Sequence, residues 1–97
     1  MTEAGIEQRV VKYCKDRKLL TYKFTSPAHR GVPDRIIIGG GKVLFLELKQ
    51  EGKKPTPLQL WEISRINTHA SCDTVVAKWA AGWEDAVKTI QETFDHA

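Results

Sequence analysis

The alternation of hydrophobic and polar positions predicts three helices and four strands. Ile6, Val10 and Cys14 recur at helical spacing after Thr2, a plausible N-cap, so a first helix is expected between Thr2 and about Leu19. Strands are expected at 22–25, 34–38, 43–49 and 74–77, and further helices at 57–70 and 83–94, with breaks at clusters of proline and glycine. The order α-β-β-β-α-β-α is typical of an α/β fold in which a mixed sheet is flanked by helices on both faces.

The size of the chain limits what it can contain. At 97 residues with 41% hydrophobic residues, it has enough apolar surface for one core, and a single domain over 1–97 is expected. The longest apolar runs, 36–38 and 43–46, are far shorter than the ~18 residues of a membrane span. No secretory signal is visible at the N-terminus, so we expect an intracellular protein that does not enter a membrane.

The positive charge is concentrated in the first two thirds of the chain. The net charge is +3, but residues 1–65 carry 13 Lys and Arg against 7 Asp and Glu, whereas residues 66–97 carry 2 against 5. An excess of cations on a small domain favours a polyanionic partner such as DNA, although solvated surfaces also carry such charge.

The glycine turn at 39–41 allows the register of a hairpin to be derived. If residues 39–42 form the loop, Ile38 faces Val43 and Asp34 lies opposite Glu47. Lys49 then points to the same face as Glu47, because side chains alternate along a strand. Two facing carboxylates repel by about 0.2–1 kcal/mol on an open surface and more when partly buried, so this arrangement favours a bound cation.

Mg²⁺ or Mn²⁺ suits such a site, because these hard cations take carboxylates, water and phosphate oxygens as ligands. The backbone carbonyl of Leu48 is a further candidate ligand. Lys49 could orient or deprotonate an attacking water, or stabilise charge on a phosphate. Metal-assisted hydrolysis of a phosphodiester is therefore the chemistry that the hairpin indicates, and a solvated hairpin face with a salt bridge is the alternative.

Two residues outside the hairpin are candidates for the same site. Glu7 lies on the apolar face of the first helix, where a charge is unusual unless it is paired or binds a metal. Gln59 begins the helix after Pro57 and could hold a water or a phosphate. Glu7 could equally be a surface residue, and Gln59 a helix-capping residue.

The ordered motifs resemble those of a nuclease family. Gly31-Val32-Pro33-Asp34 is followed after twelve residues by Glu47-Leu48-Lys49 and then by Gln59, with Thr25-Ser26-Pro27 upstream. This pattern is similar to the PD-(D/E)xK nuclease superfamily and, within it, to small stand-alone phage members of the VRR-NUC family. The resemblance extends over nearly the whole chain and implies a restriction-endonuclease-like αβββαβ core with an additional C-terminal helix.

The resemblance also implies roles for the candidate residues. Asp34, Glu47 and the Leu48 carbonyl would bind Mg²⁺ or Mn²⁺, and Glu7 would complete the site. Lys49 would be catalytic together with these acids, and Gln59 would be the helix glutamine of the motif. No organic cofactor is expected.

The implied substrate is branched DNA, with a homodimer cutting four-way Holliday junctions, in the bacterial cytoplasm if the gene is of phage origin. Candidate phosphate contacts, each of which could instead serve solubility, are Lys23, Arg30, Arg35, Lys53 and Lys54. The alternatives are a non-catalytic DNA-binding or dimerisation module, and a nuclease that acts on flaps or other branched DNA.

Overall fold

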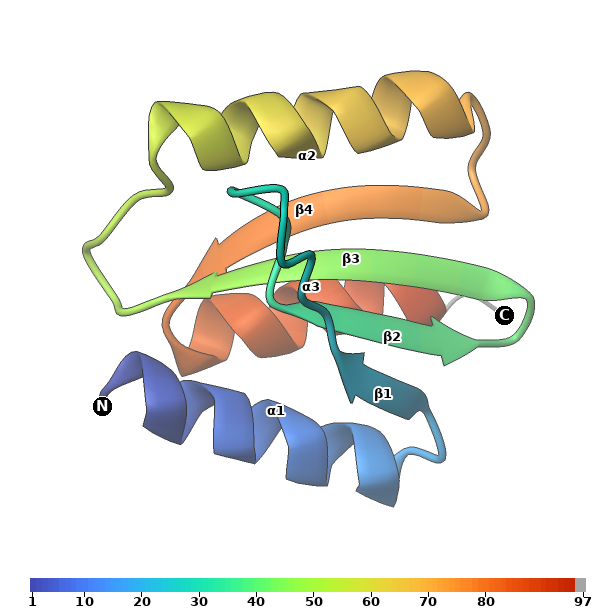
Figure 1. The fold of residues 1–97 in the computed structure, drawn as a ribbon. Helices are drawn as coiled ribbons and strands as arrows, with labels where there is room; N and C mark the ends of the chain where they lie inside the picture. The colour runs from blue at the N-terminus through green and yellow to red at the C-terminus, as the bar shows by residue number, and fades with distance from the viewer. Residues whose placement is uncertain (96–97) are drawn as a thin grey trace.

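The computed structural model describes residues 1–95 and contains every expected element in the expected order (Figure 1). The elements are α1 (Glu3–Asp16), β1 (Leu20–Lys23), β2 (Arg35–Gly39), β3 (Lys42–Lys49), α2 (Pro57–Ala70), β4 (Val75–Ala81) and α3 (Trp83–Phe94). The α/β class with a mixed sheet is therefore confirmed. In this described part of the chain, no helix is both long and apolar enough to cross a membrane.

The four strands form one sheet in the order β1-β2-β3-β4, antiparallel except for the parallel pair β3 and β4. Ile38 pairs with Val43 and Arg35 with Leu46, which is the predicted register. The turn is tighter than expected, because Gly39 already pairs with Lys42 and only Gly40 and Gly41 connect the strands. Both have positive φ (55° and 79°), the conformation that a two-residue hairpin turn requires.

Helices cover both faces of the sheet, with α1 and α3 on one face and α2 on the other (Figure 1). The main core lies between the sheet and the α1–α3 layer and is built from Leu44, Leu46 and Leu48 of β3 with residues of the two helices. On the opposite face, the Asn67 side chain anchors α2 to β4, accepting from the Ala77 N–H (2.7 Å) and donating to its carbonyl (2.9 Å).

The ends of four elements meet at one edge of the fold. β3 and β4 both end there, and α1 and α2 both begin there (Figure 1). Residues at the start of a helix and at the end of a strand are therefore brought together from positions far apart in the sequence. The candidate site lies at this edge.

Three elements differ from their expected bounds by two residues or more. The first helix ends at Asp16 rather than near Leu19, because Lys18 adopts a left-handed conformation (φ 60°). β1 lies two residues earlier than expected, since its pairing with β2 starts at Leu20. β4 extends four residues beyond Ala77, because it pairs in parallel with β3 as far as Lys49 and Ala81.

Candidate active site and metal centre

The β2–β3 hairpin brings Asp34 and Glu47 together, as the register predicts. Asp34 immediately precedes β2, and its Oδ2 accepts a hydrogen bond from the backbone N–H of Leu48 (3.1 Å). This bond fixes the Asp34 carboxylate against the end of β3. The carboxyl oxygens of the two acids come within 4.8 Å of each other.

Glu47 is the most unusual residue of the pair, because only 1% of its surface is exposed. Its Oε1 is buried without a hydrogen-bond partner among the described residues. Burial, with a contribution from the neighbouring Asp34 charge, raises the pKa of Glu47 to about 7. Burying a carboxyl oxygen without a partner costs free energy, so a ligand bound at Oε1 would offset this desolvation penalty.

Two polar side chains approach the other oxygen of Glu47. The Lys49 ammonium lies 3.5 Å from Oε2 on the same face of β3, and its side chain is only 15% exposed. The Gln59 amide donates to Oε2 from the first turn of α2 (3.2 Å). Gln59 also caps its own helix, because its Oε1 accepts from the Thr56 N–H (2.9 Å). The two roles considered for Gln59, site residue and capping residue, are therefore both present in its contacts.

The acid that α1 contributes to this cluster is Glu3 rather than Glu7. The carboxyl oxygens of Glu3, Asp34 and Glu47 all lie within 4.8 Å of one another. The Glu7 carboxylate instead binds Arg35 (3.1 Å) and approaches Lys23 (3.9 Å). The sequence contains a signal for Glu3, because residues four apart share a helix face. It is obscured by the place of Glu3 in the first turn, where acids commonly serve the helix dipole.

Comparisons with known proteins identify a sequence relative and similar solved structures. The chain is 45% identical over 65 residues to a protein named "Putative nuclease p44" of Acyrthosiphon pisum secondary endosymbiont phage 1, covering 66% of this chain and 70% of that protein. It is similar in structure to a "VRR_NUC domain protein", with a TM-score of 0.79 at 22% identity over 98% of this chain and 89% of the other. A structure described as "VRR_NUC domain" gives a TM-score of 0.71 at 27% identity over 92% and 98%. No family model matches the sequence.

The chain belongs to the VRR-NUC nuclease family. The donor set of this VRR-NUC protein fits a hard divalent cation, because three carboxylates converge and one buried oxygen has no hydrogen-bond partner within residues 1–95. Glu3 is exposed and Asp34 is partly exposed, so the cluster is open to solvent on one side. A cation held there would keep positions for water and phosphate oxygens. The Leu48 carbonyl remains a predicted ligand.

The VRR-NUC chain presents only some of its expected DNA contacts to solvent. Arg30, Lys53 and Lys54 are exposed, and Lys23 is exposed while approaching Glu7. Arg35 was expected among the phosphate contacts, but the structure buries it. Only 7% of its surface is exposed, and it binds Glu7 and Thr21. It follows Asp34 by one residue, so strand alternation turns it toward α1 and away from the acid site. Arg35 is therefore a structural cation.

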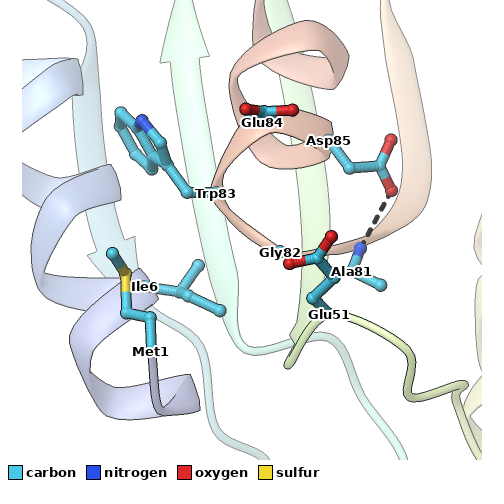
Figure 2. Close-up of a pocket in the computed structure, with 8 residues that line it drawn as sticks. All are labelled: Met1, Ile6, Glu51, Ala81, Gly82, Trp83, Glu84 and Asp85. Carbon is cyan, nitrogen blue, oxygen red and sulfur yellow. Dashed lines mark hydrogen bonds between the residues drawn. The ribbon is translucent and has the colours of Figure 1, made fainter.

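A cavity of about 360 Å³ lies between the start of α1 and the start of α3 (Figure 2). Its lining includes the acids Glu51, Glu84 and Asp85, and Asp85 accepts a hydrogen bond from the Ala81 N–H (2.9 Å). The other lining residues are Met1, Ile6, Ala81, Gly82 and Trp83, so none of the residues around it is basic. This negative lining disfavours a phosphate, and the cavity is not a candidate DNA site.

We predict that Glu3→Gln weakens Mn²⁺ binding on the order of tenfold or more, whereas Glu7→Gln leaves it within about threefold. The reason is that only Glu3 reaches the acid cluster, while Glu7 neutralises Arg35. Calorimetric titration of each variant with Mn²⁺ measures the difference. Equal weakening by both substitutions would place both acids at the metal.

We also predict a pH-dependent stability in the metal-free protein. Because the pKa of Glu47 is raised from 4.5 to about 7 in the folded state, the folded chain holds this proton more tightly than the unfolded chain. Its contribution to the free energy of unfolding is complete below about pH 4.5 and is lost as the pH rises to about 7.

Glu47→Gln removes this titration. In EDTA, its stability relative to the parent should increase between pH 5 and pH 8 when measured by urea denaturation. Glu92→Gln, the same change at an exposed position of α3, is the matched control. A constant difference between Glu47→Gln and the parent across this range would show that the Glu47 pKa is not raised.

Proposed function

We propose that this chain is a divalent-metal-dependent endodeoxyribonuclease that hydrolyses phosphodiester bonds, with residues 1–97 as one nuclease domain. The observation that carries the proposal is the buried Oε1 of Glu47, which has no partner in the described part of the chain and lies beside the carboxylates of Asp34 and Glu3. The name of the phage relative, a nuclease, supports the same reaction class. The required cofactor is Mg²⁺ or Mn²⁺, and no organic cofactor is invoked.

The acids have the role of holding the metal. Asp34, Glu47 and Glu3 would provide carboxylate ligands, and the Leu48 carbonyl a backbone ligand. When bound, a divalent cation supplies Lewis-acid stabilisation of the phosphate and makes a water easier to deprotonate. Gln59 keeps the Glu47 carboxylate in one orientation by donating to its Oε2.

Lys49 is the proposed catalytic cation. Its ammonium lies 3.5 Å from Glu47 Oε2 and is mostly buried, so its position is restricted by β3 and by this ion pair. From there it can orient the attacking water and stabilise the charge that develops on the phosphate oxygens. The side chain thus combines electrostatic stabilisation with control of the water.

Branched DNA is the proposed substrate, and a homodimer acting on four-way junctions is the proposed working form. The support is the resemblance to stand-alone phage VRR-NUC proteins, together with the exposed cations Arg30, Lys53 and Lys54. Two symmetric sites would allow paired nicks in opposed strands. Lys53 and Lys54 follow β3 directly and are the first candidates for phosphate contacts.

We predict that Glu47→Ala lowers the cleavage rate of a labelled four-way junction by at least about 10²-fold while binding is retained. Removing a ligand abolishes the metal site, but it also removes a charge that repels DNA. Denaturing gels in Mg²⁺, Mn²⁺ and EDTA measure cutting, and Glu92→Ala on α3 is the control.

The substrates in this assay separate the alternatives. Linear duplex, splayed arms and flaps accompany the junction, and metal-dependent cutting of all of them would remove the junction preference but keep the nuclease. Binding without cutting in any metal would favour a non-catalytic module. A Glu47→Ala variant as fast as the parent would disprove the site assignment.

We further predict that the double substitution Lys53→Ala and Lys54→Ala weakens DNA binding and lowers the salt slope of log K by about 1–2. The maximal cleavage rate at saturating DNA should remain close to that of the parent, because neither lysine contacts the acids. Lys88→Ala, an equally exposed change on α3, is the control and should leave the slope unchanged. An unaltered slope in the double variant would place the phosphates elsewhere.

A further inference from the structure

Glu62 on α2 is a buried carboxylate that the proposed chemistry does not use. Only 5% of its surface is exposed, and its Oε1 lies at hydrogen-bond distance from Nε2 of His29, with the Arg65 guanidinium at 3.8 Å. Buried acids are rare unless they are paired. His29 belongs to the loop between β1 and β2, so this contact ties that loop to the helix.

The same loop is packed tightly against α2 at Gly31. Its φ of +87° is a conformation that favours glycine, and a Cβ there would lie 2.9 Å from Leu58 Cγ and 3.3 Å from Glu62 Cγ. Pro33, two residues later, is fully buried and leads directly into Asp34. The path of the backbone into Asp34 is therefore defined by its contact with α2.

The other acid of the hairpin is held by the same part of this helix. Gln59 donates to Glu47, while Leu58 and Glu62 contact the loop that precedes Asp34. The first two turns of α2 thus contact both β3, at Glu47, and the loop that leads into Asp34. A displacement of the loop from α2 would change the separation of the two carboxylates without altering either acid.

We propose that His29 and Glu62 are positioning residues, which hold the loop before Asp34 on α2 and so set the place of the Asp34 carboxylate relative to Glu47. This inference rests on the proposed metal-dependent function. Neither residue touches the metal or the DNA in this account. Their effect on the reaction passes through Asp34.

Three other variants distinguish a loss of Asp34 positioning from a general loss of fold stability. His69 lines the same groove between the loop and α2, so His69→Ala is the same substitution without the contact to Glu62. Asn67→Ala breaks the bonds of α2 to Ala77 at the other end of the helix, and it destabilises the fold without releasing the loop. His29→Gln keeps a side-chain donor for Glu62 and tests rescue.

The experiment is a calorimetric titration of the full chain and each variant with Mn²⁺, alongside thermal unfolding of every protein. His29→Ala should bind Mn²⁺ about tenfold more weakly than the parent, as is common for groups that orient metal ligands. His69→Ala and Asn67→Ala should bind like the parent, although Asn67→Ala unfolds at a lower temperature. His29→Gln should recover most of the affinity, and Glu62→Leu should reproduce the loss.

A second readout needs neither metal nor activity. The Leu48 N–H is donated to Asp34 Oδ2, so its hydrogen exchange in EDTA reports whether Asp34 is in place. Exchange at Leu48 should be faster in His29→Ala than in Asn67→Ala. This measurement also decides the question if Glu62→Leu folds too poorly to titrate.

Parent-like Mn²⁺ affinity and Leu48 exchange in His29→Ala would overturn the positioning role, and so would equal weakening by Asn67→Ala. A parent that binds Mn²⁺ but cuts no DNA would disprove the proposed function while these comparisons still decide the role of His29. A parent that binds no Mn²⁺ would disprove the proposed metal site, and the Leu48 exchange in EDTA would then decide the role of His29 by itself.

Discussion

The burial of the Glu47 carboxylate next to Asp34 is the constraint around which this fold is arranged. A carboxyl group with 1% of its surface exposed must be protonated, paired or bound to a cation. The surrounding elements supply partners for only part of this carboxyl group. β3 supplies Lys49, α2 supplies the Gln59 amide, and the remaining oxygen, Oε1, has no partner among the described residues.

The positions of the neighbouring residues are related to this acid pair. The two-glycine turn sets the hairpin register that brings Asp34 to Glu47, and the Leu48 N–H then fixes the Asp34 carboxylate. α1 begins at the same edge and adds Glu3 to the cluster. Glu7, on the next turn of α1, is neutralised by Arg35. Charge is thus concentrated on one face of the hairpin and cancelled on the other.

The sequence predicts the central part of this arrangement because its signals are local. Helical periodicity, strand alternation and the glycine turn each depend on residues close together in the chain, and they place Asp34, Glu47 and Lys49 on one face. The place of Glu3 and the burial of Arg35 depend on how α1 packs on the sheet. Periodicity alone gives the face of α1 but not which turn of it reaches the end of β3.

The length of β4 is another feature that periodicity in the sequence does not predict. Its last residues, Lys78 to Ala81, have no clear alternation, and their strand conformation comes from parallel pairing with β3. The contact of His29 with Glu62 is equally non-local, because 33 residues separate them. Such features follow from tertiary pairing, which a single sequence does not encode in any short pattern.

The most direct test of the account is a crystal structure of the protein soaked in Mn²⁺, with anomalous diffraction data to locate the metal. The account predicts a peak at about 2.0–2.2 Å from Glu47 Oε1, with carboxylate oxygens of Asp34 and Glu3 completing the protein ligands. A Mn²⁺-saturated crystal with no peak at Glu47, or with Oε1 hydrogen-bonded to another group of the protein, would contradict it.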